Sequence, residues 1–243
     1  MESWKSRIKR GIVRCLPSSI KDFIGEELKM SDSCKYQNKS YSQEGEDLVL
    51  SRFIKYKTNG FYVDIGAHHP LRFSNTYRFY LNGWNGINID AMPGSMSVFN
   101  QLRPRDINIE TPLYITQKKL QYYIFSDPAF NTLSEKVANE HIDKHGAILI
   151  RQETLQTKRL DEILSEYLPH NNTIDFMSID IEGLELPVLQ SNDWLRYKPE
   201  YLLVETFVSS ILEIDKLEIH QYLSNLGYIF IAKTYNTLFY QRQ

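Results

Sequence analysis

Acidic residues are concentrated in one short segment, Ser178-Ile179-Asp180-Ile181-Glu182-Gly183-Leu184-Glu185. The segment follows an apolar run, and on an extended strand Asp180 and Glu182 would point to the same face because they are two positions apart. A carboxylate in that position can take the proton of a hydroxyl group. With Glu205 at the end of the next expected strand, Asp180 and Glu182 can instead hold a Mg²⁺ ion that acidifies the hydroxyl. The sequence leaves both roles open.

A second polar cluster, Val63-Asp64-Ile65-Gly66-Ala67-His68-His69-Pro70, also ends an apolar run. Gly66 permits the turn and the close backbone approach that a bound cofactor requires. Asp90 ends the following strand, where an acidic side chain can accept both ribose hydroxyls of a nucleotide-like cofactor, or can cap a helix ahead of Pro93. Later glycines that would accommodate a pyrophosphate are missing, which disfavours a dinucleotide.

Histidines offer further proton acceptors. His68 and His69 follow Gly66, and they either act as bases near the cofactor or donate hydrogen bonds that fix the loop. His68 therefore joins Asp180 and Glu182 as a catalytic candidate. We interpret His141 and His145 as ordinary surface residues.

Alternating strands and helices must position these groups. The expected strands are 61–66, 86–90, 107–115, 174–181, 201–207, 228–234 and 237–241, and the expected helices are 74–84, 93–102, 158–168, 184–194 and one closed by Gly227. The last two strands are joined around Tyr235-Asn236 without room for a crossover helix, so they must pair antiparallel. The chain is therefore predicted to be an α/β protein whose seven-stranded, mostly parallel sheet is closed by an antiparallel C-terminal hairpin.

Two additional strands, 120–125 and 147–155, flank a polar region that contains Asn131-Thr132, His141 and His145. This insertion is where we expect the specificity for the acceptor substrate.

Several motifs together resemble one family, the FkbM-type methyltransferases. They are Ser42-Gln43-Glu44-Gly45-Glu46-Asp47, the Asp64 and Asp180 segments above, Ser74-Asn75-Thr76 and Gly83-Trp84-Asn85-Gly86-Ile87. The resemblance implies a class I methyltransferase Rossmann-like fold, S-adenosylmethionine as methyl donor, and O-methylation of a sugar, glycan or related small molecule, as in polysaccharide biosynthesis. The cofactor-binding candidates are then Gln43, Asp64, Gly66, Ala67, Asp90 and Asp180. Gln43, Glu46 and Asp47 either cover the cofactor or cap a helix that runs to Phe53.

Two other functions are weighed beside this one. A nicotinamide-dependent oxidoreductase is disfavoured by the missing glycines and by the terminal hairpin. In a non-catalytic Rossmann-like binding module, Asp64, Asp90 and Glu182 would be relics on a scaffold.

Composition and the first residues set the remaining expectations. The 243 residues are 42% apolar and 13% aromatic with a formal net charge of −2, so the chain can form one domain with a core and lacks the basic excess of a nucleic-acid binder. Cys15 and Cys34 give neither a zinc site nor a disulfide framework, which fits a cytoplasmic protein. Residues 1–40 predict a basic amphipathic segment and a linker before a methyltransferase domain at 41–243. Residues 1–24 either contact the inner face of the membrane as a peripheral anchor or pack on the domain.

Overall fold

The computed structural model describes residues 37–55, 57–170, 172–208 and 210–243. The expected amphipathic segment at residues 1–24 lies outside the described residues. Residues 40–243 form one compact unit. Within the described part of the chain, no helix is long and apolar enough to cross a membrane.

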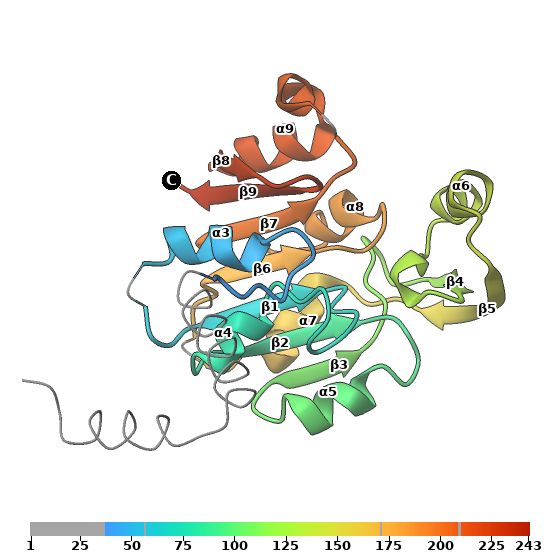
Figure 1. The fold of residues 1–243 in the computed structure, drawn as a ribbon, viewed down its shortest axis with the longest axis horizontal. Coiled ribbons are helices and arrows are strands. Elements are labelled where there is room, and N and C mark those ends of the chain that lie inside the picture. Colours follow the sequence, from blue (N-terminus) through green and yellow to red (C-terminus); the bar gives the residue numbers. More distant parts are fainter. Residues whose placement is uncertain (1–36, 56, 171, 209) are drawn as a thin grey trace, which may run out of the picture. The chain divides into compact units, whose positions relative to one another are not determined.

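A seven-stranded sheet organises this unit (Figure 1). Its order is β3-β2-β1-β6-β7-β9-β8, and only β9 breaks the parallel direction: it pairs antiparallel with both β7 and β8. The strands are β1 (Phe61–Ile65), β2 (Asn85–Asp90), β3 (Ile107–Glu110), β6 (Phe176–Ile179), β7 (Tyr201–Glu205), β8 (Tyr228–Lys233) and β9 (Thr237–Arg242). The predicted fold, including the antiparallel C-terminal hairpin, is confirmed.

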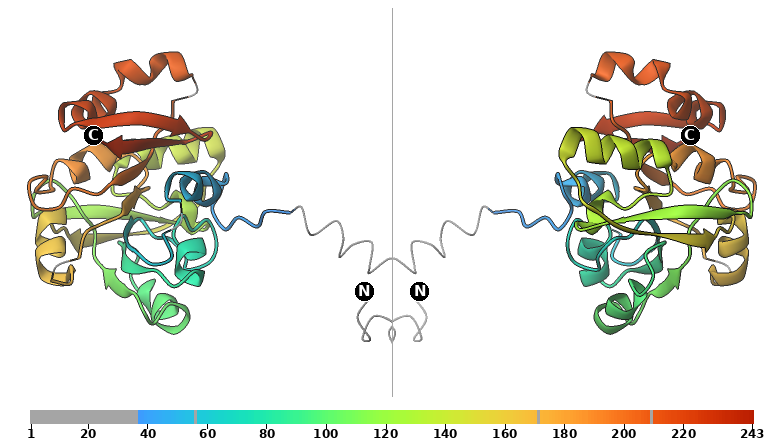
Figure 2. Two further views of the ribbon diagram at one scale, coloured as in Figure 1. Left: turned by 90° about the vertical axis from the view of Figure 1, so that its left-hand side faces the viewer. Right: turned by 90° about the vertical axis from the view of Figure 1, so that its right-hand side faces the viewer.

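Helices cover both faces of the sheet, as the side views in Figure 2 show. On one face, β-strand residues such as Val63 and Met177 pack against α7, α8 and α9; on the other, Tyr62 and Phe176 pack against α3 and α4. Buried β1 and β6 therefore read as continuous apolar runs. The helices of the main fold are α3 (Glu46–Phe53), α4 (Tyr77–Leu81), α5 (Met96–Leu102), α7 (Leu160–Tyr167), α8 (Glu185–Leu189) and α9 (Glu218–Asn225), with the 3₁₀ turn η2 (Ile211–Lys216) before α9.

The insertion forms a separate small sheet after β3, beside the main sheet in Figure 1. β4 (Lys119–Phe125) pairs antiparallel with β5 (Leu149–Gln156), and η1 (Pro128–Phe130) and α6 (Glu135–His145) lie between them in the chain. Ser134 caps α6 by accepting a hydrogen bond from the Val137 N–H, and Gly146 ends the helix at a φ of 64°. The predicted additional strands are thus present, with a helix between them that the sequence analysis did not predict.

Two elements end well before their predicted boundaries. The strand expected at 107–115 ends at Glu110. The helix α8 was expected to reach Trp194. It ends at Leu189 instead. The indole N–H of Trp194 donates a 3.0 Å hydrogen bond to the carbonyl of Leu189, the last residue of α8. Trp194, which was predicted to lie within the helix, therefore lies beyond its end and pairs with one of its terminal carbonyl groups.

Candidate active site

A cavity of about 340 Å³ opens where β1, β2, β6 and β7 end. The insertion closes its other side. Most of the predicted site residues reach it: the lining includes Gln43, Gly66, His68, Asp90, Asp180, Glu182 and Glu205. Ligands of open α/β sheets bind at the carboxyl ends of the strands, so the cavity is in the expected place for a cofactor and a substrate.

Gly66 is required by the protein's own backbone. It has a φ of 77°, and a Cβ atom built on it would lie 1.7 Å from the carbonyl oxygen of Asp180. The close approach that we assigned to a cofactor is therefore an approach to the loop after β6. The absence of a side chain at Gly66 thus lets the turn after β1 pack directly against the loop that carries Asp180 and Glu182.

Asp90 faces the cavity and also fixes the turn after Gly66. Its two carboxylate oxygens accept hydrogen bonds from the backbone N–H groups of His68, at 2.9 Å, and Met92, at 2.7 Å. Burial nevertheless raises the pKa of Asp90 above its usual range. Asp90 does not cap the following helix, because α5 begins only at Met96. Binding of ribose hydroxyls stays a prediction, which the geometry permits because a carboxylate that accepts two N–H bonds still has lone pairs.

Asp64 and Ala67, by contrast, do not line the cavity. Asp64 lies on the opposite face of β1 from Ile65, where it accepts a 2.7 Å hydrogen bond from the Thr76 hydroxyl, and burial raises its pKa to about 6. Ala67 packs with Met96 and Phe99. The structure gives Asp64 a place in a buried polar network instead of a contact with a cofactor.

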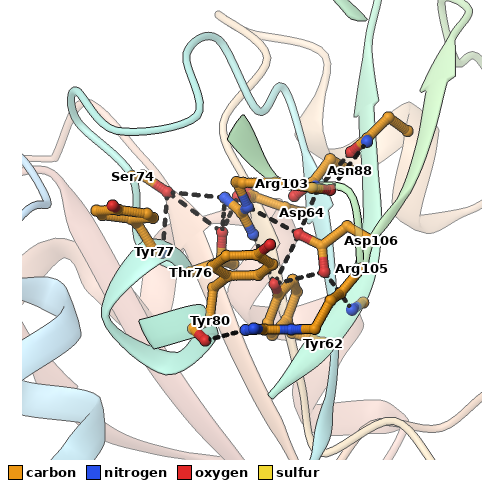
Figure 3. A network of polar contacts seen from close by, with 12 residues as sticks. Tyr62, Asp64, Ser74, Thr76, Tyr77, Tyr80, Asn88, Arg103, Arg105 and Asp106 are labelled. Carbon is orange, nitrogen blue, oxygen red and sulfur yellow. Dashed lines mark hydrogen bonds and ion pairs between the residues drawn. The ribbon is translucent and has the colours of Figure 1, made fainter. Parts of the chain in front are cut away.

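That network is centred on the buried ion pair Arg103–Asp106 (Figure 3). The guanidinium of Arg103 donates to Asp106 at 2.7 Å, to the Tyr62 hydroxyl at 2.6 Å and to the Thr76 hydroxyl at 2.9 Å. Next to Thr76, the Asn75 side-chain amide donates to the Ser178 hydroxyl of β6 at 2.9 Å. The Ser74-Asn75-Thr76 motif thus ties β1 and β6 together beneath the cavity.

The carboxylate cluster forms, although the strand-face argument for it was wrong. β6 ends at Ile179, before Asp180, and Glu182 has a left-handed φ of 53°. This turn brings the carboxylates of Asp180 and Glu182 close to that of Glu205 in β7. One carboxylate oxygen of each residue lies within 4.8 Å of the other two. The turn, and not the period of an extended strand, gathers the three carboxylates.

Burial raises the pKa of all three carboxyl groups. The pKa of Glu182 is raised to about 8, by burial and then by the charge of Asp180. Glu205 hydrogen-bonds to Asp180, and its pKa is also raised, by burial and by the same charge. Because the pKa of Glu182 lies near neutrality, this group can accept a proton from a substrate and release it again.

Glu185 supports this turn from the start of α8. One of its carboxylate oxygens accepts hydrogen bonds from the backbone N–H groups of Ile181 and Gly183, both at 3.1 Å. Its side chain is buried, and burial raises its pKa to about 7. Glu185 shapes the loop that presents Glu182.

The paired histidines after Gly66 have different roles. His68 lines the cavity, with a φ of 53°, and burial lowers its pKa. His69 does not line the cavity: its Nδ1 accepts hydrogen bonds from the N–H groups of Leu71 and Arg72, each at 3.1 Å. His69 fixes the loop, as one of our interpretations held, but as an acceptor and not as a donor.

Our interpretation of His141 as an ordinary surface residue was wrong, because its side chain is buried, with 7% of the residue exposed. His145 is exposed, as predicted, and its ring also borders the cavity that His141 lines. His141 Nε2 lies 3.6 Å from Glu182 Oε2. Their spacing, i and i+4 on α6, places both rings on one helix face, a signal that was available once the helix was recognised.

Gln43 lines the cavity next to Asn236 of the terminal hairpin. The N–H of Asn236 donates to the Glu44 carboxylate at 2.9 Å, and the Thr234 hydroxyl donates to Glu46 at 2.6 Å. Asp47 is buried and accepts hydrogen bonds from Ser40, Tyr41 and Ser42. The motif therefore ties the start of α3 to the hairpin turn and leaves Gln43 at the cavity.

The sheet order with its antiparallel β9 is that of the class I methyltransferase fold, and the cavity lies at the carboxyl ends of its parallel strands. Residues 64–230 match the model of the methyltransferase FkbM domain, and the chain belongs to this family of S-adenosylmethionine-dependent methyltransferases.

The chain is only distantly similar to two solved structures. A TehB-like SAM-dependent methyltransferase from Corynebacterium glutamicum is 9% identical over 94% of this chain and 100% of its own, with a TM-score of 0.42. YjhP from E. coli is 12% identical over 81% of this chain and 69% of its own, with a TM-score of 0.35. A comparison with curated proteins gives no match.

Proposed function

We propose that this methyltransferase transfers the methyl group of S-adenosylmethionine to a hydroxyl oxygen of a sugar, glycan or related small molecule. The observation that carries the proposal is the position of Glu182, a cavity carboxylate with a pKa raised to about 8. The ionised form of such a group, which grows in population as the pH approaches 8, can take the proton of an alcohol. A reaction in polysaccharide assembly in the cytoplasm would suit this activity.

The residues at the Asp90 end of the cavity fit the methyl donor. Ile89, Met92 and Leu113 offer apolar walls for a flat purine, and Asp90 offers a carboxylate for ribose hydroxyls. The acidic groups of the cavity also suit a positively charged sulfonium. We therefore propose that the residues in contact with the methyl donor are Asp90, Gly66, Gln43 and Asp180. We assign Asp64 and Ala67 a structural role, without contact to the methyl donor.

S-adenosylmethionine supplies an electrophilic methyl group. In the transfer, the acceptor oxygen forms a bond to the methyl carbon while the carbon–sulfur bond breaks, which leaves S-adenosylhomocysteine. The hydroxyl proton passes to the Glu182 carboxylate. The protein's part is to hold the oxygen in line with the methyl group and to accept that proton.

A Mg²⁺ ion is a second candidate for the role of activating the hydroxyl. Asp180, Glu182 and Glu205 offer oxygen ligands within 4.8 Å of one another, the ligand type that Mg²⁺ prefers. Thermal unfolding in EDTA, Mg²⁺ and Ca²⁺, with Glu205→Gln as a comparison, tests this role. A rise in melting temperature with Mg²⁺ that the variant lacks supports it, and equal melting temperatures in EDTA and Mg²⁺ contradict it.

Calorimetric titration tests the donor. S-adenosylhomocysteine should bind to the wild-type protein, NAD⁺ should not, and Asp90→Ala should weaken the affinity by about tenfold or more, the equivalent of a lost charged hydrogen bond of about 1.5–3 kcal/mol. Asp193→Ala, a substitution outside the cavity, is the control. Binding of NAD⁺ alone would refute the proposal.

We also propose that residues 1–24 hold the enzyme at an anionic membrane surface, since apolar residues recur there every four positions with basic residues mainly between them. Flotation with vesicles that contain phosphatidylglycerol, for the full chain and for residues 40–243, tests this contact. Equal flotation of both would contradict it.

A further inference from the structure

Two buried polar atoms face each other in the cavity without a hydrogen-bond partner. They are Nε2 of His141 and Oε2 of Glu182, 3.6 Å apart, and neither has a hydrogen bond to any described residue. The distance is too long for a hydrogen bond between them. Leaving such buried atoms unpaired is unfavourable, which makes this pair a place where a bound group would be stabilised.

A hydroxyl group satisfies both atoms at once. It can donate its proton to the Glu182 carboxylate and accept a hydrogen bond from His141, in the tautomer that carries a proton on Nε2. One lone pair of the hydroxyl oxygen then stays free for attack on a methyl group. A phosphate or carboxylate oxygen has no proton to donate to the ionised Glu182 that the transfer requires, and it would meet that carboxylate as a second acceptor.

The insertion holds this pair together. The Thr132 hydroxyl donates a 3.0 Å hydrogen bond to the backbone carbonyl of Glu182. A Cβ atom on Gly183 would lie 2.8 Å from the Val137 side chain of α6, so the helix packs closely on the loop. The position of His141 relative to Glu182 is therefore fixed by the fold.

Aromatic faces lie next to the pair. The Phe130 ring centroid is 4.9 Å from that of His141, and it is stacked on His145 at 6.1 Å with an interplanar angle of 18°. All three rings line the cavity. Flat apolar faces of this kind bury the apolar face of a ring-shaped ligand while its hydroxyls reach polar partners.

Among the described residues, the cavity lining offers no cationic side chain to bind an anion. Among its described lining residues, Asp90, Asp180, Glu182 and Glu205 are acidic and none is Lys or Arg. Phosphate and carboxylate groups are usually bound by Arg or Lys side chains, which this cavity lacks among the described residues.

We propose that the acceptor is an uncharged, ring-shaped alcohol such as a neutral glycoside, held by the insertion. Its reacting hydroxyl lies between Glu182 and His141, and its ring packs on Phe130. This inference rests on the proposed O-methyltransferase activity. It names His141 as a further catalytic residue, since the residue touches the reacting oxygen, and it excludes an anionic sugar at this subsite.

Saturation-transfer NMR on the full chain with saturating S-adenosylhomocysteine tests the inference. The probes are uncharged methyl hexopyranosides and methyl 6-deoxyhexopyranosides, beside the hexuronic acids and hexose 6-phosphates that match them. We expect signal from uncharged glycosides at least fivefold stronger than from their anionic counterparts. His141→Leu and Phe130→Ala should abolish that signal, His141→Gln should retain part of it because an amide N–H can donate in its place, and the exposed His170→Ala should leave it unchanged.

The outcomes separate the two proposals. Binding of S-adenosylhomocysteine by every variant, together with loss of the glycoside signal in His141→Leu, supports the inference. Equal or stronger signal from anionic sugars, no signal from any uncharged glycoside on a protein that binds S-adenosylhomocysteine, or full signal in His141→Leu would overturn it. Failure of the wild-type protein to bind S-adenosylhomocysteine would instead overturn the proposed function on which the inference rests.

Discussion

Replacing Asp106 by Asn should destabilise the protein far more than an isosteric change normally does. Asp106 is 9% exposed as a residue, its side chain is fully buried, and it accepts hydrogen bonds from Arg103, the Tyr62 hydroxyl, the Gly86 N–H and the Asn88 amide. The Arg103 guanidinium has no exposed surface. The substitution therefore leaves a buried cation without its counter-charge.

The magnitude follows from that burial. Breaking a buried ion pair by removing one partner costs about 3–5 kcal/mol, because the remaining charge is desolvated and uncompensated. For a domain of this size, each kcal/mol lowers the melting temperature by about 2–4 °C, so Asp106→Asn should lower it by roughly 6–20 °C. Glu166→Gln, which breaks the Lys158–Glu166 pair at 3.6 Å between half-exposed side chains, should cost about 0–1 kcal/mol.

Urea unfolding of four proteins measures the effect: wild type, Asp106→Asn, Arg103→Met and the double variant. The double variant should lose about 1–3 kcal/mol less than the sum of the single losses, because removing the cation relieves the penalty that Asp106→Asn creates. Additive losses, or a loss below 1 kcal/mol in Asp106→Asn, would show that the buried pair does not hold β1, β2 and α5 together as the contacts indicate.

Three further predictions concern the site. Gly66→Ala should abolish activity and lower the melting temperature, because its Cβ would lie 1.7 Å from the Asp180 carbonyl oxygen; a variant with wild-type turnover would contradict this. Because burial raises the pKa of Glu182 to about 8, the folded state holds a proton that the unfolded state has lost, so stability should fall as the pH rises from about 4.5 to about 8. Melting curves of Glu182→Gln should show a shallower fall over that range, and identical slopes would argue against a buried neutral Glu182. Glu185→Leu should lower both turnover and the melting temperature, since it frees two N–H groups of the loop that carries Asp180 and Glu182; turnover equal to that of the wild type would contradict this.

The fold could be predicted from the sequence because local patterns decide it. Apolar runs such as Phe61–Ile65 specify buried strands, and the short link at Tyr235-Asn236 forces the last two strands to pair antiparallel. The end of α8 could not be predicted in this way, because the partner that ends it, the Trp194 side chain, folds back to Leu189 from outside the helix. Helix α6 was missed because its apolar positions are sparse.

The site could be predicted only in part, since residue type shows that a group is reactive but not where it points. Asp90, Asp180, Glu182 and Glu205 were found because strand ends in parallel sheets share one edge. Asp64 was assigned to the cofactor because it precedes Gly66, whereas its position in β1 directs it to Thr76 on the other face. His141 escaped notice because its partner, Glu182, is distant in sequence and turns toward it through a left-handed backbone conformation.

The contacts around Gly66 and Glu182 make donor and acceptor positions interdependent. The Asp90 carboxylate accepts a hydrogen bond from the His68 N–H, and Gly66 packs against the Asp180 carbonyl. The Glu182 carbonyl accepts a hydrogen bond from the Thr132 hydroxyl of the insertion. A shift in any one of these loops therefore moves the others, and in-line transfer loses much of its rate when the reacting atoms are misplaced by about 1 Å. Changes of acceptor among related enzymes should then lie in side chains such as Phe130 that face the cavity, while the backbone path that joins the two halves of the site stays fixed.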